Sequence, residues 1–146
     1  MVSFPGMQPE LAEQSPFGTI LVIEDDEDTR EMLTVCIESE ISCRVMSLSG
    51  AEVVFQRLQE IEEAKPRLFI IDFQLITLTG LEIYDSLHAL KEFEQVPAII
   101  ITATTLNLEL ERAIAQRNLT LLLKPFDIDE LIACIERMLI VPGQLI

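Results

Sequence analysis

The chain has 146 residues, which is enough for one domain with a substantial core, and it carries a net charge of −15. A surface this acidic repels the phosphate backbone of DNA and RNA, which argues against nucleic-acid binding. The mean hydropathy of +0.36 is high, but no apolar run reaches the roughly 18 residues of a membrane span, and a buried parallel sheet explains the value without a membrane.

Residues 1–18 contain several prolines and are interpreted as an N-terminal arm. The arm has neither the basic start nor the apolar stretch of a secretory signal. The three cysteines show no CxxC or metal-binding spacing and are typical of reduced thiols. We therefore expect a cytoplasmic protein with one domain over residues 19–141 and a short tail over residues 142–146.

Five short apolar segments alternate with helical patterns along the domain. The predicted strands are residues 19–23, 43–48, 67–72, 96–102 and 119–124. The predicted helices cover about residues 29–37, 49–61, 80–93, 105–117 and 127–140. Capping boxes, Ser49 with Glu52 and Asp127 with Glu130, are expected to start the second and fifth helices. Five successive βα units predict a doubly wound α/β fold, a parallel sheet with helices on both faces.

Polar side chains stand at the carboxyl ends of four of these strands, the edge of such a sheet where ligands bind. They are Glu24 and Asp25 after the first strand, Asp72 after the third, Thr102 after the fourth and Lys124 after the fifth. Carboxylates held this close repel one another unless a cation lies between them, and Mg²⁺ prefers oxygen ligands of this kind, with Mn²⁺ as an alternative. Asp72 is then a candidate acceptor of a phosphoryl group, with Lys124 balancing its charge and Thr102 donating a hydrogen bond.

Each of these residues also has a simpler interpretation when it is taken alone. The acidic turn fits a solvated helix start, Asp72 fits a strand-end cap, and Lys124 fits a structural counter-ion. Only their combination favours a metal and phosphoryl site. His88, the one histidine of the chain, is predicted to lie on the outer face of the third helix, without a function as a phosphohistidine.

Four stretches resemble, in this order, the receiver domain of two-component response regulators. They read ILVIEDDEDTREML from Ile20, LFIIDFQLITLTGLEIY from Leu68, IIITAT from Ile99 and LLLKPF from Leu121. The resemblance covers about residues 19–140. It implies a flavodoxin-like fold with five parallel strands in the order 2-1-3-4-5, and a histidine kinase or phosphotransfer protein as the phosphoryl donor.

The resemblance also implies particular tasks for single residues. Asp72 is the phosphorylated residue, Thr102 is the switch hydroxyl, and Lys124 pairs with the phosphoryl group and the acids. The metal ligands are Glu24, Asp25, Asp72 and the backbone carbonyl of Gln74. Gln74 and Thr104 tune the loss of the phosphoryl group, and the peptide bond between Lys124 and Pro125 is cis.

The chain departs from the family pattern at three places. Ile76 and Thr79 replace residues that are usually proline and aspartate in the loop after Asp72, and Arg117-Asn118 replaces a usual Gly-Ala pair. Leu121 stands where the family often has an aromatic residue that moves with the switch hydroxyl. The relay from the phosphoryl group to the surface is therefore expected to work without a moving ring.

Four classes of function are considered. The first is a phosphoacceptor module, which is not an enzyme in its own right and acts on a partner through the face formed by residues 105–117, 119–124 and 127–140, or on a second copy of the chain. The alternative is a receiver-like scaffold that binds proteins without phosphorylation. A hydrolase is disfavoured because it would need a general acid, and no second carboxylate follows Asp72 at close spacing. A flavin carrier is disfavoured because its phosphate would need N–H and hydroxyl donors where Glu24 and Asp25 stand. We expect no contact with nucleic acids or membranes.

Overall fold

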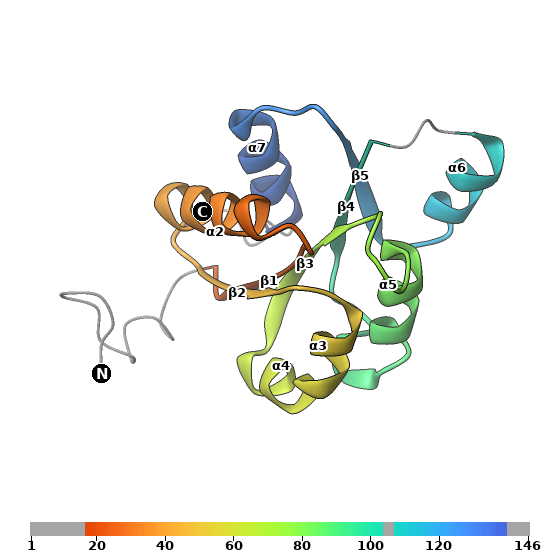
Figure 1. Ribbon diagram of the computed structural model, residues 1–146, viewed down its shortest axis with the longest axis horizontal. Coiled ribbons are helices and arrows are strands. Elements are labelled where there is room, and N and C mark those ends of the chain that lie inside the picture. Colours follow the sequence, from red (N-terminus) through yellow and green to blue (C-terminus); the bar gives the residue numbers. More distant parts are fainter. Residues whose placement is uncertain (1–16, 104–106, 140–146) are drawn as a thin grey trace.

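The computed structural model describes residues 17–103 and 107–139, which form one parallel sheet with helices on both faces (Figure 1). The strands are β1 Thr19–Ile23, β2 Arg44–Leu48, β3 Pro66–Asp72, β4 Ala98–Thr102 and β5 Leu119–Leu123. They pair in the order β2-β1-β3-β4-β5, every neighbour parallel. The predicted strands and the predicted strand order are confirmed.

Two hydrophobic cores lie on the two faces of the sheet. The helices are α2 Glu27–Glu40, α3 Ala51–Gln56, α4 Leu58–Ala64, α5 Gly80–His88, α6 Leu108–Ala115 and α7 Ile128–Leu139, and a 3₁₀ turn, η1, covers Lys91–Phe93. In Figure 1, α2 and α7 cover one face, and α3, α4 and α5 cover the other. Successive residues of β1 point alternately into the two cores, as in a strand buried on both faces. Within the described part of the chain, no helix is long and apolar enough to cross a membrane.

The helix after β2 differs from the prediction in its start and its continuity. The prediction of a capping box formed by Ser49 and Glu52 is wrong, because Gly50 occupies the N-cap and no side chain caps α3. Glu52 is then the second residue of the helix, one position too early for a capping box. The predicted single helix is also broken at Arg57, whose backbone angles (φ −111°, ψ 25°) lie outside the helical range and separate α3 from α4.

The remaining helices follow the sequence pattern more closely. The predicted capping box of Asp127 and Glu130 is present before α7, because the Glu130 N–H donates to Asp127 Oδ1 at 2.9 Å and the Asp127 N–H to Glu130 Oε1 at 3.4 Å. A further capping box, which the sequence analysis missed, joins Thr79 and Glu82 at the start of α5. That helix ends at His88, five residues before its predicted end.

The prediction for His88 is wrong, because its ring faces inward. The ring stacks on Tyr84 with centroids 3.7 Å apart and meets the edge of Phe69 at 5.6 Å. Its Nε2 lies 2.6 Å from the carbonyl oxygen of Val96, and its Nδ1 lies 2.9 Å from that of Tyr84. Tyr84 is buried, and His88 follows it by one helical turn, so the half-buried His88 lies at the edge of the buried stripe of α5.

Candidate functional site

Three carboxylates meet at the carboxyl ends of β1 and β3. Glu24 and Asp25 follow β1, Asp72 ends β3, and one oxygen from each lies within 4.8 Å of the other two. In the described ranges, this is the one such group of three or more potential metal-binding side chains. Glu24 is 3% and Asp72 is 6% exposed, so two of the three carboxylates are largely withdrawn from water.

The local fold separates these acids from Asp26. The side chain of Asp26 caps α2, since its Oδ2 accepts the N–H of Thr29 at 2.8 Å and the hydroxyl of Thr29 at 2.7 Å. The N–H of Asp26 donates to Glu24 Oε2 at 3.1 Å and helps to fix that carboxylate. Pairing of β1 with β3 then brings Glu24 and Asp25 beside Asp72. Of three consecutive acids, two therefore point to the cluster and one starts the helix.

The electrostatics of the cluster favour a bound cation. Burial raises the pKa of Glu24 to about 7, and the charge of Asp72 and the side chains of Asp25 and Asp72 act in the same direction, against a lowering by the N–H of Asp26. A donor set of carboxylate oxygens suits a hard divalent ion such as Mg²⁺. The residues present thus fit a metal site, which agrees with the predicted seat of Mg²⁺ at this edge of the sheet.

A basic residue reaches the cluster from β5. The Nζ of Lys124 lies 3.8 Å from Asp72 Oδ2, and the Lys124–Pro125 peptide bond is cis. Thr102 is fully buried at the end of β4, next to β3 in the sheet, and its carbonyl oxygen accepts the N–H of Lys124 at 2.8 Å. The strands thus bring Lys124 directly to Asp72 and place Thr102 at the end of the strand beside it.

The loop after Asp72 turns back tightly upon it. The N–H of Gln74 donates to Asp72 Oδ1 at 3.2 Å, and Gln74 also forms an isolated antiparallel bridge with Thr79. At Gly80, an added Cβ would lie 2.7 Å from the carbonyl oxygen of Asp72 and 2.9 Å from Phe73 Cα. The sequence analysis placed Gly80 only at the start of the third predicted helix. Its steric importance depends on a contact with backbone atoms of residues seven and eight positions earlier in the chain, which the local sequence pattern does not predict.

The sequence analysis also assigned hydrolysis tuning to Thr104 and noted Leu121 at the position where the family often has an aromatic residue. Thr104 lies outside the described residues. Leu121 is half-buried in β5 and packs against the core that α3, α4 and α5 cover.

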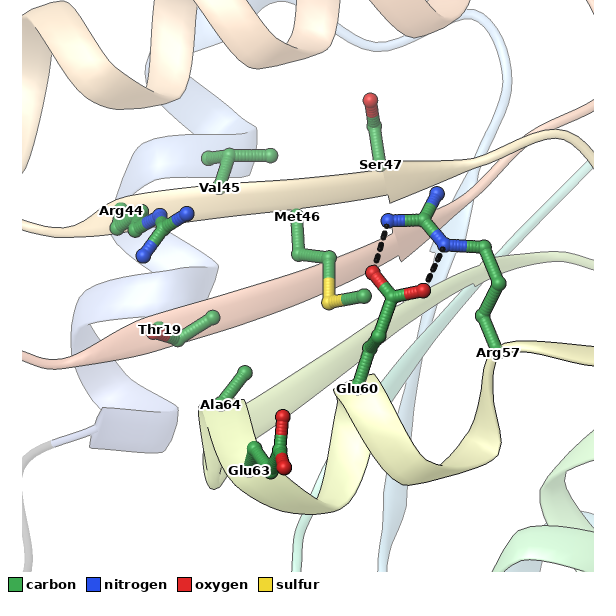
Figure 2. A pocket seen from close by; sticks show the side chains of 9 residues that line it. All are labelled: Thr19, Arg44, Val45, Met46, Ser47, Arg57, Glu60, Glu63 and Ala64. Carbon is green, nitrogen blue, oxygen red and sulfur yellow. Dashed lines mark hydrogen bonds and ion pairs between the residues drawn. The ribbon is translucent and has the colours of Figure 1, made fainter. Parts of the chain in front are cut away.

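A separate pocket of about 440 Å³ lies beside β2 and contains none of the acid cluster (Figure 2). Its lining residues are Thr19, Arg44, Val45, Met46, Ser47, Arg57, Glu60, Glu63 and Ala64. The guanidinium of Arg57 pairs there with the carboxylate of Glu60, with nitrogen–oxygen distances of 3.2 and 2.8 Å (Figure 2). In this pocket the charges of Arg57 and Glu60 balance each other. The acids at the strand ends therefore remain the better candidate for a functional site.

Comparison with known proteins assigns the family. The model of the response regulator receiver domain matches residues 20–136. The phosphate regulon transcriptional regulatory protein PhoB of Rhizobium meliloti is 32% identical over 120 residues, which are 82% of this chain and 51% of PhoB. The "Uncharacterized 14.6 kDa protein in sodA1 3'region" of Leptolyngbya boryana is 29% identical over 118 residues, 81% of this chain and 87% of that protein.

Other similarities agree on the fold. The DNA-binding response regulator MtrA of Mycobacterium tuberculosis (strain ATCC 25618 / H37Rv) is 27% identical over 114 residues, 78% of this chain and 47% of MtrA. The chain thus spans about half the length of PhoB and MtrA. The chemotaxis protein CheY4 of Vibrio cholerae superposes with a TM-score of 0.73 at 19% identity, covering 83% of this chain and 98% of CheY4. With the family model matched over most of its length, the chain belongs to the family of response regulator receiver domains.

Proposed function

We propose that this receiver domain accepts a phosphoryl group on Asp72 from a histidine kinase or phosphotransfer protein and thereby changes its affinity for a protein partner. The observation that carries the proposal is the position of Asp72, buried beside Glu24 and Asp25 with Lys124 Nζ at 3.8 Å. This carboxylate lies beside one ammonium group and beside two further carboxylates that could hold a metal ion. Both features favour transfer of an anionic group.

The transfer needs a nucleophile and charge neutralisation. An oxygen of Asp72 attacks the phosphorus, the bond from phosphorus to the donor imidazole breaks, and the imidazole nitrogen keeps the electron pair. Lys124 offsets the charge of the phosphoryl oxygens, and the Thr102 hydroxyl donates a hydrogen bond to one of them. Glu24, Asp25, Asp72 and the carbonyl of Gln74 would hold Mg²⁺, which supplies further positive charge when bound.

The output surface is proposed on α6, β5 and α7. Leu108 on α6 is 62% exposed and Leu123 on β5 is 47% exposed, which supports an apolar contact on this side of the sheet. Partners of this face are proteins, a second copy of the chain included. The net charge of −15 disfavours DNA contact by this domain.

The phosphorylated state should be long-lived. Gln74 and Thr104 occupy the positions that tune hydrolysis in the family, and neither side chain is a carboxylate that could activate water. We expect slow loss of the phosphoryl group, and faster loss when a carboxylate replaces Gln74. Equal decay rates in the parent and in Gln74→Glu would contradict this assignment.

Intact-mass spectrometry after incubation with acetyl phosphate and Mg²⁺ tests the function directly. The parent should gain one phosphoryl group, and Asp72→Asn should gain none while it keeps the circular dichroism of the parent. Asp129→Asn, a change of an exposed acid at the start of α7, is the matched control and should gain the group normally. A parent that takes up no phosphoryl group would instead support the scaffold alternative.

A Mg²⁺ titration tests which of the consecutive acids Asp25 and Asp26 contributes to the metal site. Asp25→Ala should weaken Mg²⁺ binding strongly, because Asp25 belongs to the cluster. Asp26→Ala should leave Mg²⁺ binding nearly unchanged and lower the stability of the fold, since it removes the N-cap of α2. Equal losses of Mg²⁺ affinity in the two variants would refute the assignment.

A further inference from the structure

The helix α6 is held to the domain differently from its neighbours. No residue of Leu108–Ala115 is buried, and neither core contains a residue of α6. By comparison, α5 buries four residues and α7 buries five. Burial of apolar surface is the main force that holds a helix against a sheet, so α6 is held weakly along its length.

The C-terminal end of α6 is tied to α5 by a two-pronged ion pair. The guanidinium of Arg117 donates from Nε to Asp85 Oδ1 at 2.9 Å and from Nη2 to Asp85 Oδ2 at 2.8 Å. Its third nitrogen, Nη1, donates to the carbonyl oxygen of Ala113 in the last turn of α6. One side chain thus contacts the last turn of α6 and α5 at the same time, although the Asp85 carboxylate is 52% exposed.

A second contact reinforces the first. The N–H of Asn118 donates to the hydroxyl oxygen of Tyr84 at 2.9 Å, and the carbonyl oxygen of Asn118 accepts the N–H of Ala98 at 3.2 Å. Tyr84 is 4% exposed and stacks on His88. We call Tyr84, Asp85, Arg117 and Asn118 the clamp. It connects the C-terminal end of α6 to the exposed Asp85 and the buried Tyr84 of α5.

In the part of the chain that the structure describes, which omits residues 104–106, the N-terminal end of α6 shows no comparable attachment. Asn107 caps the helix by accepting the N–H of Leu110 at 2.8 Å, a contact within the same segment. Among the residues that the structure describes, no hydrogen bond or ion pair joins 107–112 to another element. This end is also the one nearer in sequence to Thr102 at the strand-end site. The two ends of α6 therefore differ in how firmly they are held.

We propose that the clamp is a fixed pivot for α6, and that Asp85 and Arg117 are positioning residues for the signal. When Asp72 is phosphorylated, the N-terminal half of α6 shifts about the clamp while the C-terminal end stays in place. The exposed Leu108 then undergoes the largest displacement. This inference rests on the proposed phosphorylation of Asp72, to which it adds the residues that confine the response to one half of a helix.

Hydrogen exchange measured by mass spectrometry on the full chain tests the pivot, with and without acetyl phosphate and Mg²⁺. In the parent, phosphorylation should change the exchange of amides at 108–111 and leave 113–118 unchanged. In Arg117→Met, the change should extend to 113–118, where exchange should differ about five- to tenfold between the two states. Asp85→Asn, which removes the opposite partner from α5, should give the same pattern.

Arg57→Met is the matched control, because it removes a guanidinium that pairs in the same two-pronged way with Glu60, away from α6. It should keep the pattern of the parent. A purely structural function of the clamp would accelerate exchange at 113–118 equally in both states of the Arg117 variant, and that result would overturn the proposal. So would a parent whose response is uniform over 108–118.

Intact mass recorded on the same samples distinguishes failure of the proposed phosphorylation from failure of the pivot. A parent that gains no phosphoryl group overturns the proposed function and this inference with it. A parent that gains the group but shows no difference between the halves of α6 overturns the pivot alone.

Discussion

Replacement of Glu24 by glutamine should stabilise the metal-free protein at alkaline pH. The pKa of Glu24 is raised from 4.5 to about 7, mainly by burial. The unfolded chain therefore loses this proton at lower pH than the folded chain, so the contribution of Glu24 to stability falls as pH rises from about 4.5 to about 7. At about pH 8 the folded protein holds a buried carboxylate that glutamine would replace by a neutral amide.

The size of the effect follows from the same pKa. One pKa unit is worth about 1.4 kcal/mol, so a carboxyl raised from 4.5 to about 7 costs about 3 kcal/mol once it is ionised. The side-chain oxygen of glutamine can still accept the Asp26 N–H that Glu24 accepts at 3.1 Å, so little is lost in return. We expect Glu24→Gln to gain about 2–3 kcal/mol at about pH 8 and less than about 1 kcal/mol at about pH 5.

Urea unfolding followed by far-ultraviolet circular dichroism, with a chelator present, measures this difference. Addition of Mg²⁺ should then stabilise the parent at about pH 8 and have a much smaller effect on Glu24→Gln, since binding to the folded state adds to stability. Glu31→Gln, an exposed acid on α2, is the control and should change stability by no more than about 0.5 kcal/mol at either pH. A Glu24→Gln variant that is no more stable than the parent at about pH 8 would refute the argument.

Three further substitutions test the framework of the site and of α5, each by urea unfolding. Gly80→Ala should destabilise the protein by about 2 kcal/mol or more, because the new Cβ would meet backbone atoms of Asp72 and Phe73. Gly50→Ala is its control and should change stability little, because an added Cβ there has no other atom within 4 Å. Thr79→Ala should lose about 1 kcal/mol with the capping box of α5. His88→Ala should lose about 3 kcal/mol with its stacking and its two carbonyl contacts, and a loss below about 1 kcal/mol would mean that the ring is not held as described.

The sheet could be predicted from the sequence because its signal is local. Each strand is a short apolar run between polar residues, and the strand ends found differ from the predicted ones by at most two residues. The break at Arg57 was not predictable in this way, since Val53, Val54, Leu58 and Ile61 keep a helical spacing across it. The inward position of His88 was missed because the burial of Tyr84, one turn earlier, was not counted.

The acid cluster could be predicted because parallel strands end at one edge. Glu24, Asp25 and Asp72 come together for that reason alone, without knowledge of any side-chain conformation. The contribution of Gly80 and the connection between Asp85 and Arg117 depend instead on contacts between distant parts of the chain. Asp85 and Arg117 are 32 residues apart, and although Arg117 stands where the family usually has the glycine of a Gly-Ala pair, that departure does not indicate Asp85 as its partner.

The same two residues bear on the missing aromatic side chain at Leu121. A leucine that packs against the core has no polar tip and cannot exchange a buried position for a solvated one as a tyrosine can. If the state of Asp72 reaches the surface, an element with little buried area must respond, because a tightly packed core does not deform continuously. Of the helices described here, α6 alone buries no residue. A weakly packed helix without a fixed end would lose order as a whole, whereas one held at its C-terminal end by Arg117 can change position at the other end. In the relay proposed here, displacement of α6 about the clamp takes the part that a rotating aromatic ring would have at Leu121.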